Sequence, residues 1–560
     1  ATTGPLGQGV AMSVGMAAAG RWLGATYNRP SFDLFDYNVY AFCGDGDMME
    51  GLGSEAASLA GHLRLSNLCW IYDNNRISIE GRTDITFTED VATRFLAYDW
   101  NVIRVGDVND LDTLTRAFET FLATRERPTL IIVDSHIGYG APHRQDTKEA
   151  HGEPLGADEA RLSKEFYGWN PDAQFLVPDG VREHFGAQLG RRGAAAHSEW
   201  NKLFAAYERK FPEAAHEIGC LGERTLPSDW NQDLPVFPPD PKGIAGRDAS
   251  AKTQNAIARR VPWLLGGSAD LWPSTKTLLT FEGAGEFQAP GHGGDYSGRN
   301  FHFGVREHAM CAFVNGMALS GLRPYGSSFL VFSDYCRGSL RLSAVMEVPS
   351  IFIWTHDSIN LGEDGPTHQP IEHLASLRAM PGMIVLRPAD ANEVVESWRV
   401  IMEVKDRPVC LVLSRQALPT FDRKALGAAS GVARGAYVLA DAPSGKPDVL
   451  LLATGSEVSL CLVAREQLIK EGIGARVVSM PSWEIFDEQS EDYQDSVLPP
   501  EIEARVSIEA ASTFGWAKFT GPRGAIVGMR SFGLSAPMKV VAERFGFEPE
   551  HVVAAAREQV

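Results

Sequence analysis

The sequence has no long apolar run and no excess of basic residues. Runs such as VPSIFIW (348–354) and DVLLLA (448–453) are short, well below the roughly 18 apolar residues that a membrane-spanning helix needs. The net charge is −19, from 52 Lys and Arg against 71 Asp and Glu, whereas nucleic acid and anionic membranes both attract a positive surface. We therefore expect neither as a partner. An anionic substrate would need local positive charge in its binding site.

The sequence also shows neither a secretory signal nor paired cysteines. The opening ATTGPLGQGV has neither the basic nor the apolar region of a secretory signal. The cysteines are few, odd in number and scattered, which is typical of reduced core residues in a cytoplasmic protein rather than of a disulfide framework or a zinc site. The seven are Cys43, Cys69, Cys220, Cys311, Cys336, Cys410 and Cys461.

Length and pattern together predict several α/β domains. At 560 residues the chain exceeds the size at which a single core keeps growing. Short β-rich runs such as NVYAFCG (38–44) alternate with helical patterns, which favours parallel sheets flanked by helices. A segment rich in Pro and Asp lacks clear periodicity and is interpreted as a linker. The predicted α/β domains are residues 1–210, 243–425 and 426–560, with the linker at 211–242.

Two apolar runs each end in polar residues that suit a hard cation. GDGDMMEG (44–51) follows one run and DNN (73–75) ends the next. The carboxyl ends of neighbouring parallel strands meet at one edge of a sheet, which would bring Asp45 and Asn75 together. Mg²⁺ prefers such sparse oxygen ligands completed by phosphate and water. The alternative is a tight Asp-Gly turn, whereas an EF-hand is excluded because Met49 occupies a ligand position.

Other residues have both a structural and a functional interpretation. Glu307 opens an apolar helical pattern, where an acidic residue is favourable without any catalytic role. Phe329, Phe332 and Tyr335 recur every three residues, which is typical of core packing. An arginine offers a planar fork suited to phosphate oxygens, although taken singly each is a surface or salt-bridged residue. The candidates for an anion site are Arg247, Ser274, His356, His368 and Arg415.

Seven strings, in this order and spacing, are similar to those of transketolases. They extend essentially from one end of the chain to the other. The strings are TTGPLGQG (2–9), GDGDMMEG (44–51), DNNRISIEG (73–81), GGSADL (266–271), GVREHAM (304–310), THDSINLGEDGPTHQP (355–370) and SRQ (414–416).

This resemblance implies two thiamine-diphosphate-binding folds, a C-terminal α/β domain, and a divalent metal, Mg²⁺ or else Ca²⁺ or Mn²⁺. Asp45, Asn75 and the carbonyl of Ile77 would bind the metal, and a Cβ at Gly46 would obstruct the diphosphate. His151, by itself a loop histidine, is implied near the diphosphate and the substrate. The implied cofactor-binding residues are Gly4, Leu6, Gly44, Asp45, Gly46, Glu50, Asn75, His151, Phe329, Phe332 and Tyr335.

The resemblance also assigns catalytic roles. Glu307 would hydrogen-bond N1′ of the aminopyrimidine, so we expect a buried carboxyl with a raised pKa. Phe329, Phe332 and Tyr335 would enclose that ring by stacking, and this interpretation and core packing both predict that they are buried. His368 would carry a proton, since its ordinary pKa lies near neutrality.

The implied reaction moves a two-carbon ketol unit between sugar phosphates, in the pentose phosphate pathway. Arg247, Ser274, His356 and Arg415 would bind the acceptor phosphate, while Asp364 and His368 would meet the sugar hydroxyls. A homodimer is implied, with the cofactor between subunits.

One feature of this sequence departs from the transketolase pattern. Transketolases carry a segment of about a hundred residues before TTGPLGQG, whereas this sequence opens one residue ahead of that motif. Loss of the segment would expose apolar sheet surface. Two alternatives follow, a catalytically impaired truncated form or one chain of a split enzyme. A separate alternative with altered specificity is a formaldehyde-accepting relative, dihydroxyacetone synthase.

Overall fold

The computed structural model describes residues 2–560, so Ala1, where the first predicted domain begins, lies outside the described residues. The chain forms two compact units. The first comprises the chain up to Thr225 together with Phe287–Gly298, and the second comprises Leu226–Glu286 and Arg299–Val560. No helix in the described part of the chain is both long enough and apolar enough to cross a membrane.

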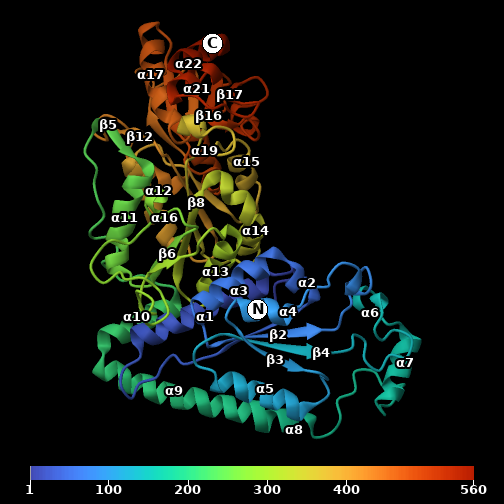
Figure 1. Ribbon diagram of the computed structural model, residues 1–560. Coiled ribbons are helices and arrows are strands. Elements are labelled where there is room, and N and C mark those ends of the chain that lie inside the picture. Colours follow the sequence, from blue (N-terminus) through green and yellow to red (C-terminus); the bar gives the residue numbers. More distant parts are fainter. Residues whose placement is uncertain (1) are drawn as a thin grey trace. The chain divides into compact units, whose positions relative to one another are not determined.

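A four-stranded parallel sheet, in the order β1-β2-β4-β3, forms the centre of the first unit. Figure 1 shows the long helices α1 and α3 on one face of this sheet and α5 on the other. The strands are β1 (Val39–Gly44), β2 (Leu68–Asn74), β3 (Asn101–Val105) and β4 (Thr129–Asp134). The helices are α1 (Gln8–Tyr27), α2 (Asp45–Met49), α3 (Gly51–His62), α4 (Val91–Ala97) and α5 (Leu111–Ala123).

Alternation along β2 decides which side chains reach each face of the sheet. Ile71 packs in an apolar cluster with Phe121 of α5. Trp70 is on the other face, where its Nε1 donates to the Ser13 hydroxyl of α1 at 2.9 Å. Tyr72 therefore shares the face of Trp70, and this brings its hydroxyl to the start of α2.

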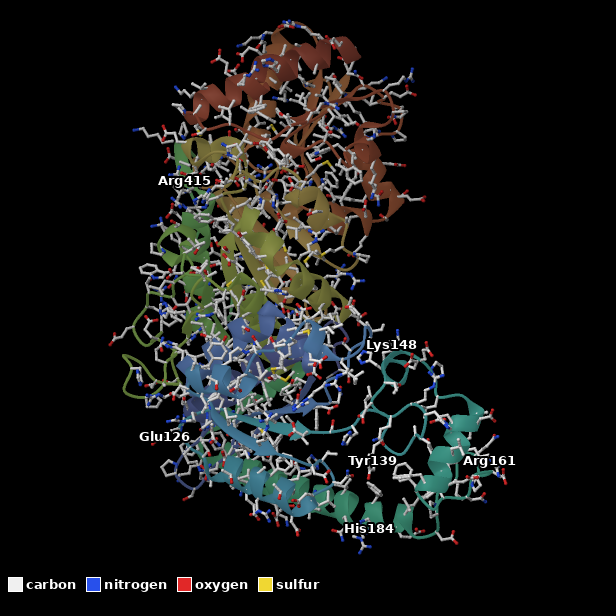
Figure 2. All side chains as sticks on the ribbon, turned by 45° about the vertical axis from the view of Figure 1, so that its right-hand side comes forward. Glu126, Tyr139, Lys148, Arg161, His184 and Arg415 are labelled. Carbon is white, nitrogen blue, oxygen red and sulfur yellow. The ribbon has the colours of Figure 1, made fainter. Side chains whose placement is uncertain are left out.

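Helices and loops follow β4 in the first unit. Tyr139, which is labelled in Figure 2, packs edge-on against Phe166. The ring centroids are 5.6 Å apart. The segment 211–242, which the sequence predicts to be a linker, begins instead with the helix α10. Proline suits a first helical turn, and Ala215 of α10 is buried in one apolar cluster with Tyr207 of α9. These helices are α6 (Lys148–Gly152), α7 (Ala157–Phe166), α8 (Val181–Phe185), α9 (Arg191–Lys210) and α10 (Pro212–Glu223).

The second unit contains a six-stranded parallel sheet in the order β10-β11-β9-β8-β6-β7. Its strands are β6 (Leu264–Ser268), β7 (Asn300–His302), β8 (Arg323–Phe329), β9 (Ile351–Thr355), β10 (Ile384–Leu386) and β11 (Val409–Leu413). A small antiparallel pair consists of β5 (Asp240–Ala245) and β12 (Ala417–Thr420). The helices are α11 (Gly246–Arg260), α12 (Trp272–Thr275), α13 (Glu307–Leu319), α14 (Arg337–Val345), α15 (His373–Arg378) and α16 (Ala391–Glu403).

A five-stranded sheet in the order β13-β15-β14-β16-β17 completes the second unit, and only β13 runs antiparallel to its neighbour. Its strands are β13 (Tyr437–Ala440), β14 (Val449–Ala453), β15 (Ala475–Ser479), β16 (Arg505–Ser512) and β17 (Ala525–Met529). The helices are α17 (Glu457–Lys470), α18 (Trp483–Asp487), α19 (Glu491–Val497), α20 (Ala517–Thr520), α21 (Met538–Phe545) and α22 (Pro549–Gln559). All seven cysteines are buried and free, which confirms that they are reduced core residues.

Candidate active site

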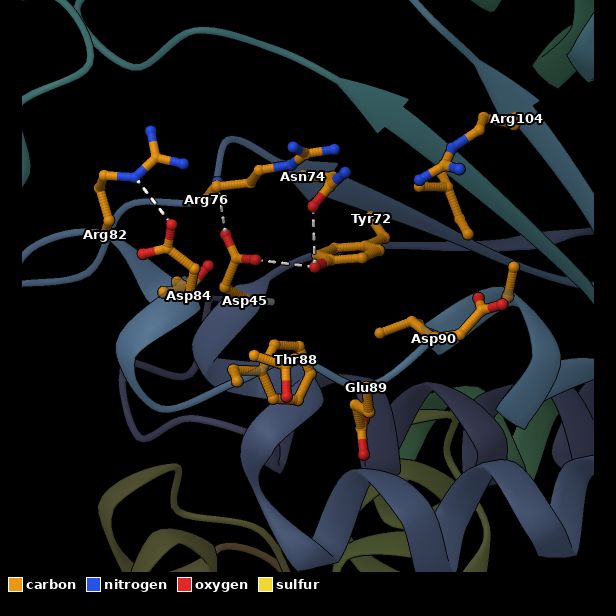
Figure 3. A pocket seen from close by; sticks show the side chains of 15 residues that line it. Asp45, Tyr72, Asn74, Arg76, Arg82, Asp84, Thr88, Glu89, Asp90 and Arg104 are labelled. Atoms are coloured by element: carbon orange, nitrogen blue, oxygen red, sulfur yellow. Dashed lines mark hydrogen bonds and ion pairs between the residues drawn. The ribbon is translucent and has the colours of Figure 1, made fainter.

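Asp45 lies where β1 ends and α2 begins, and it is only 4% exposed. Its Oδ1 accepts a hydrogen bond from the Tyr72 hydroxyl at 2.7 Å, and its Oδ2 accepts one from the Arg76 backbone N–H at 3.1 Å (Figure 3). Burial raises the pKa of Asp45 above its ordinary value. A buried carboxylate is costly unless it is compensated, so this position suits a positively charged ligand.

The other predicted metal ligands lie in the segment that follows β2, and one residue of this segment contacts Asp45. Gly44 of β1 pairs in register with Asp73 of β2, so the two parallel strands end side by side. Asn75 is half-buried, and its Oδ1 accepts the Ile77 N–H at 3.0 Å. Because Asp45 binds the N–H of Arg76, it contacts the residue between these two predicted ligands.

The donor set fits a hard divalent cation. It would consist of one carboxylate, one amide oxygen and one backbone carbonyl, from Asp45, Asn75 and Ile77, all of them oxygens of the kind that Mg²⁺ prefers. The Asn75 oxygen uses one lone pair for its bond to Ile77, which leaves a second one for an ion. A cavity of about 460 Å³ is lined by Asp45 and Arg76, whereas Asn75 and Ile77 line a second cavity that also includes Arg76.

The loop before α1 meets the start of α2 through a residue to which sequence reasoning assigned no role. Asp47 accepts the Gly7 N–H at 2.7 Å through Oδ1 and the Gly44 N–H at 2.9 Å through Oδ2. The signal was present, because an acidic residue in the first turn of a helix is a common capping group. Asp47 therefore joins the two glycine-containing motifs of the first unit.

Leu6 and Gly46 lie against each other in this arrangement. A Cβ on Gly46 would approach the Leu6 Cδ1 to 2.7 Å, closer than carbon atoms pack. Leu6 is itself 52% exposed, and the same loop, including Gly4, lines a cavity together with Asp47. A Cβ on Gly7 would lie 3.1 Å from the Cβ of Glu50, which places Glu50 beside this loop.

His151 is exposed on the short helix α6. It lines neither the cavity beside Asp45 nor the one beside Asn75 among the described residues. Its role stays a prediction. By contrast, Tyr72 and Asn74 line the cavity, although neither was assigned a role. Tyr72 was missed because a strand residue has no motif of its own, whereas Asn74 lies within the DNN motif, which was the available signal.

In the second unit, Glu307 is the first residue of α13, as the sequence predicts. It is 7% exposed, and its Oε1 accepts a hydrogen bond from the Ser328 hydroxyl of β8 at 3.3 Å. Burial raises the pKa of this carboxyl, which confirms the expected direction. Glu307 therefore holds a proton more readily than an ordinary glutamate.

The three aromatic residues form a ladder rather than a buried stripe. Phe329 ends β8 and is buried, Phe332 is half-buried, and Tyr335 is 66% exposed. The prediction that all three are buried within the chain is therefore wrong. The segment Leu330–Cys336 is a 3₁₀ helix, in which every third residue returns to the same face. The rings consequently follow one another from the interior to the surface, at centroid distances of 5.7 and 6.0 Å.

Next to this ladder lie the predicted anion-binding residues. The Phe329 ring is 3.7 Å from the His356 ring, and the Phe332 ring is 5.5 Å from the His368 ring, measured between centroids. Arg247, at the start of α11, donates from Nη1 to the Ser274 carbonyl at 2.7 Å.

The charges of this cluster act on His356. This histidine is 3% exposed, and burial, followed by the nearby charges of Arg247, Arg415 and His368, lowers its pKa to about 3. Arg415 is exposed (Figure 2). The structure thus supplies the local positive charge that an anionic ligand requires in an acidic protein.

Asp364 lies in the same loop as His368, at the exposed end of the 3₁₀ helix Ile359–Asp364. No hydrogen bond or ion pair of its side chain is present among the described residues. Its place in the substrate site therefore stays a prediction.

Comparison with known proteins identifies three matching family models. Residues 1–227 match a model described as the transketolase thiamine diphosphate binding domain. Residues 242–420 match the transketolase pyrimidine binding domain. Residues 435–548 match the transketolase-like C-terminal domain.

Complete proteins match over nearly the whole chain. A transketolase from Halalkalibacterium halodurans is 50% identical over 558 residues, which cover 100% of this chain and 82% of that protein. The solved transketolase from Leishmania mexicana has a TM-score of 0.95 at 40% identity and covers 100% of this chain and 81% of its own. A Pichia stipitis transketolase in complex with sedoheptulose 7-phosphate also has a TM-score of 0.95, at 42% identity, with the same coverage of 100% and 81%.

Proposed function

This chain belongs to the transketolase family, and we propose that it reversibly transfers a two-carbon ketol unit between sugar phosphates. The donor is a ketose phosphate such as xylulose 5-phosphate, and the acceptor is an aldose phosphate such as ribose 5-phosphate or erythrose 4-phosphate. The complex of the Pichia stipitis relative with sedoheptulose 7-phosphate supports this class of substrate. Our proposed domain limits are 1–210, 243–425 and 426–560.

One observation gives this proposal its strongest support. Glu307, whose carboxyl has a raised pKa, bonds to Ser328, and the next residue, Phe329, packs against His356 of the cationic cluster. A carboxyl with a raised pKa, an aromatic ladder and the proposed anion site are thus adjacent in a single unit. The proposed ketol transfer between phosphorylated sugars would use all three.

Thiamine diphosphate, when bound, supplies a carbanion centre and an electron sink. In our proposal Asp45, Asn75 and the Ile77 carbonyl hold Mg²⁺, or alternatively Ca²⁺ or Mn²⁺, which neutralises the diphosphate. Glu307 would hold a proton on its carboxyl and donate it in a hydrogen bond to the aminopyrimidine N1′. The face of the aromatic ladder excludes water from that ring.

The second unit would bind and orient the sugars. Arg247, His356 and Arg415 bind the acceptor phosphate. The low pKa of His356 keeps its ring neutral, so one ring nitrogen accepts a hydrogen bond and the other donates one. The Thr355 hydroxyl lies 2.8 Å from Nδ1; when it donates to Nδ1, the ring proton is on Nε2 and is available to the phosphate. Ser274 contributes to the same site.

Asp364 and His368 would bind the sugar hydroxyls and the oxygens at C1 and C3 of the donor, and His368 would carry protons to and from them. We further propose a homodimer in which a second copy contributes to the cofactor site. The exposed ring of Tyr335 at the end of the aromatic ladder supports this proposal, since a stacking surface of this kind is normally covered when it is in use.

A coupled assay with xylulose 5-phosphate and ribose 5-phosphate tests the function. We expect ketol transfer only when thiamine diphosphate and Mg²⁺ are both added to the stripped protein. Absence of transfer with both present would favour the impaired or split-chain alternative. Preferential use of formaldehyde as acceptor would favour dihydroxyacetone synthase.

Replacing Arg415 with alanine tests the phosphate site. We expect KM for ribose 5-phosphate to rise about 10- to 100-fold, because a charge-assisted hydrogen bond is lost, while KM for unphosphorylated erythrose stays the same. Arg407→Ala is the control, since Arg407 is half-buried and pairs with Glu488 instead. Equal changes in KM for both acceptors would contradict a phosphate contact.

A further inference from the structure

The loop after β9 holds His356 in a conformation that a non-glycine residue rarely adopts. Its φ angle is +61°, in the left-handed region, where a side chain other than glycine is disfavoured. Such a conformation persists only where the surroundings impose it. The Thr355 hydroxyl and the Phe329 ring contact the imidazole, but neither holds the backbone that follows it.

The next residue is anchored by a buried ion pair. Asp357 is 3% exposed, and its Oδ2 accepts hydrogen bonds from Nε and Nη2 of Arg387 at 3.0 and 2.7 Å. Its Oδ1 accepts a weaker bond from the Ser358 hydroxyl at 3.3 Å. The carboxylate one residue after His356 is therefore bound to a single guanidinium from the end of β10.

Arg387 is fully buried and is held from its other side by the C-terminal five-stranded sheet and its helices. Its Nη1 donates to Glu457 Oε2 at 2.5 Å and to Thr454 Oγ1 at 3.0 Å. The Gly455 N–H donates to the Arg387 carbonyl at 3.1 Å. A Cβ on Gly455 would approach the Arg387 Cζ to 2.7 Å, so only glycine leaves room for the guanidinium there.

Further charged residues extend the buried network around Arg387. Glu509 of β16 lies 3.9 Å from Arg387 and forms two 2.8 Å hydrogen bonds with Arg378. The two arginines lower the pKa of Glu509 to about 2 despite its burial. Removing one member of a buried charge network leaves its partner uncompensated, so a change at Glu457 alters the forces on Asp357 through Arg387.

We propose that Asp357, Arg387 and Glu457 form a positioning relay through which the C-terminal domain fixes the backbone of His356 and thereby sets the affinity for the phosphate of the sugar substrate. This inference rests on the proposed phosphate site, and it gives the C-terminal domain a role in substrate selection. The three are positioning residues, because they act through His356 and touch no reacting atom.

Two conservative variants test the relay. Asp357→Asn weakens the link next to His356, and Glu457→Gln weakens it on the far side of Arg387. Asp441→Asn is the matched control, because it neutralises a carboxylate that pairs with Arg476 at 2.8 Å in the same domain but has no bond to the relay. Affinity for ribose 5-phosphate and for inorganic phosphate is measured by calorimetry, and KM and kcat are measured with phosphorylated and unphosphorylated acceptors.

We expect both relay variants to bind ribose 5-phosphate and inorganic phosphate about 3- to 30-fold more weakly, the size of effect that such coupled residues produce. The KM for unphosphorylated erythrose, and kcat at saturating acceptor, stay unchanged. In the His356→Ala background the additional effect of Asp357→Asn disappears, because the two residues act in series. Should Asp357→Asn fail to fold, the same cycle is run with Glu457→Gln.

Different results would contradict the proposed relay and the proposed phosphate site. Normal affinity for phosphorylated ligands in His356→Ala would contradict the proposed phosphate site, and the relay with it. If His356→Ala binds phosphorylated ligands more weakly but the relay variants bind them normally, the relay alone is overturned. The relay is also overturned if both acceptors lose affinity equally, or if Asp441→Asn has the same effect as Asp357→Asn.

Discussion

Glu307→Ala is expected to lower kcat by about 100- to 10,000-fold, the contribution typical of a positioned acid or base, while thiamine diphosphate still binds. The reason is that Glu307 is buried at the start of α13 with a raised pKa, and it is the proton-holding carboxyl of the proposed reaction. Single-turnover kinetics and calorimetric titration with the cofactor measure the two effects separately. Glu307→Gln should behave alike, since it keeps the shape but loses the proton exchange.

Glu393→Gln is the matched control for this prediction. Glu393 is also a fully buried glutamate in the first turn of a helix, α16, and burial also raises its pKa. Its carboxylate bonds to Tyr437 and Ser479 instead, so we expect kcat to be retained. Normal turnover in Glu307→Ala would refute the role given to Glu307.

The raised pKa of Glu307 also has a consequence for stability. A carboxyl whose pKa is higher in the folded state stabilises the fold fully below its unfolded pKa and loses that contribution as pH rises through the folded value. The free energy of unfolding of the unsubstituted protein should therefore fall, relative to Glu307→Gln, as pH rises above the ordinary glutamate range. Chemical denaturation at several pH values measures this difference, and a constant difference would contradict the raised pKa.

Asp45→Asn is expected to weaken binding of thiamine diphosphate with Mg²⁺ by at least about 100-fold, because it removes the only carboxylate from the proposed metal site. The unliganded protein should remain folded and be no less stable at neutral pH, since a buried amide costs less than a buried charge. Calorimetry with Mg²⁺ and the cofactor measures the affinity, and thermal unfolding measures the stability.

The control for this variant is Asp84→Asn. Asp84 lines the same cavity but is exposed and pairs with Arg82, so its replacement removes equal charge without touching the proposed ligands. Cofactor affinity within a factor of two of the unsubstituted protein is expected for Asp84→Asn. The same result for Asp45→Asn would exclude the proposed metal site.

The local chemistry of the site was predictable because it depends on short segments. A glycine-flanked aspartate after one strand and an asparagine after the next are expected at the same sheet edge when the strands are parallel neighbours, and Gly44 does pair with Asp73. That Asp45 and Asn75 share one ion stays a prediction. The start of α13 at Glu307 likewise follows from the apolar pattern that it opens. The transketolase motifs added the roles of these residues.

Other features could not be predicted, because they depend on residues that come from separate elements. Tyr72 looks like any strand residue until the alternation of β2 directs its hydroxyl to Asp45. The exposure of Tyr335 depends on a 3₁₀ helix, which the three-residue spacing did not distinguish from an α-helix.

The sequence by itself determined the family, the α/β class, and the residues placed at strand and helix ends, because each of these is encoded in contiguous strings and their order. Only the tertiary structure decided how charges from distant segments combine. It surrounds His356 with Arg247 and Arg415, and it connects Asp357 through Arg387 to Glu457. Burial and distance set the strength of such interactions, and both arise only when the chain has folded.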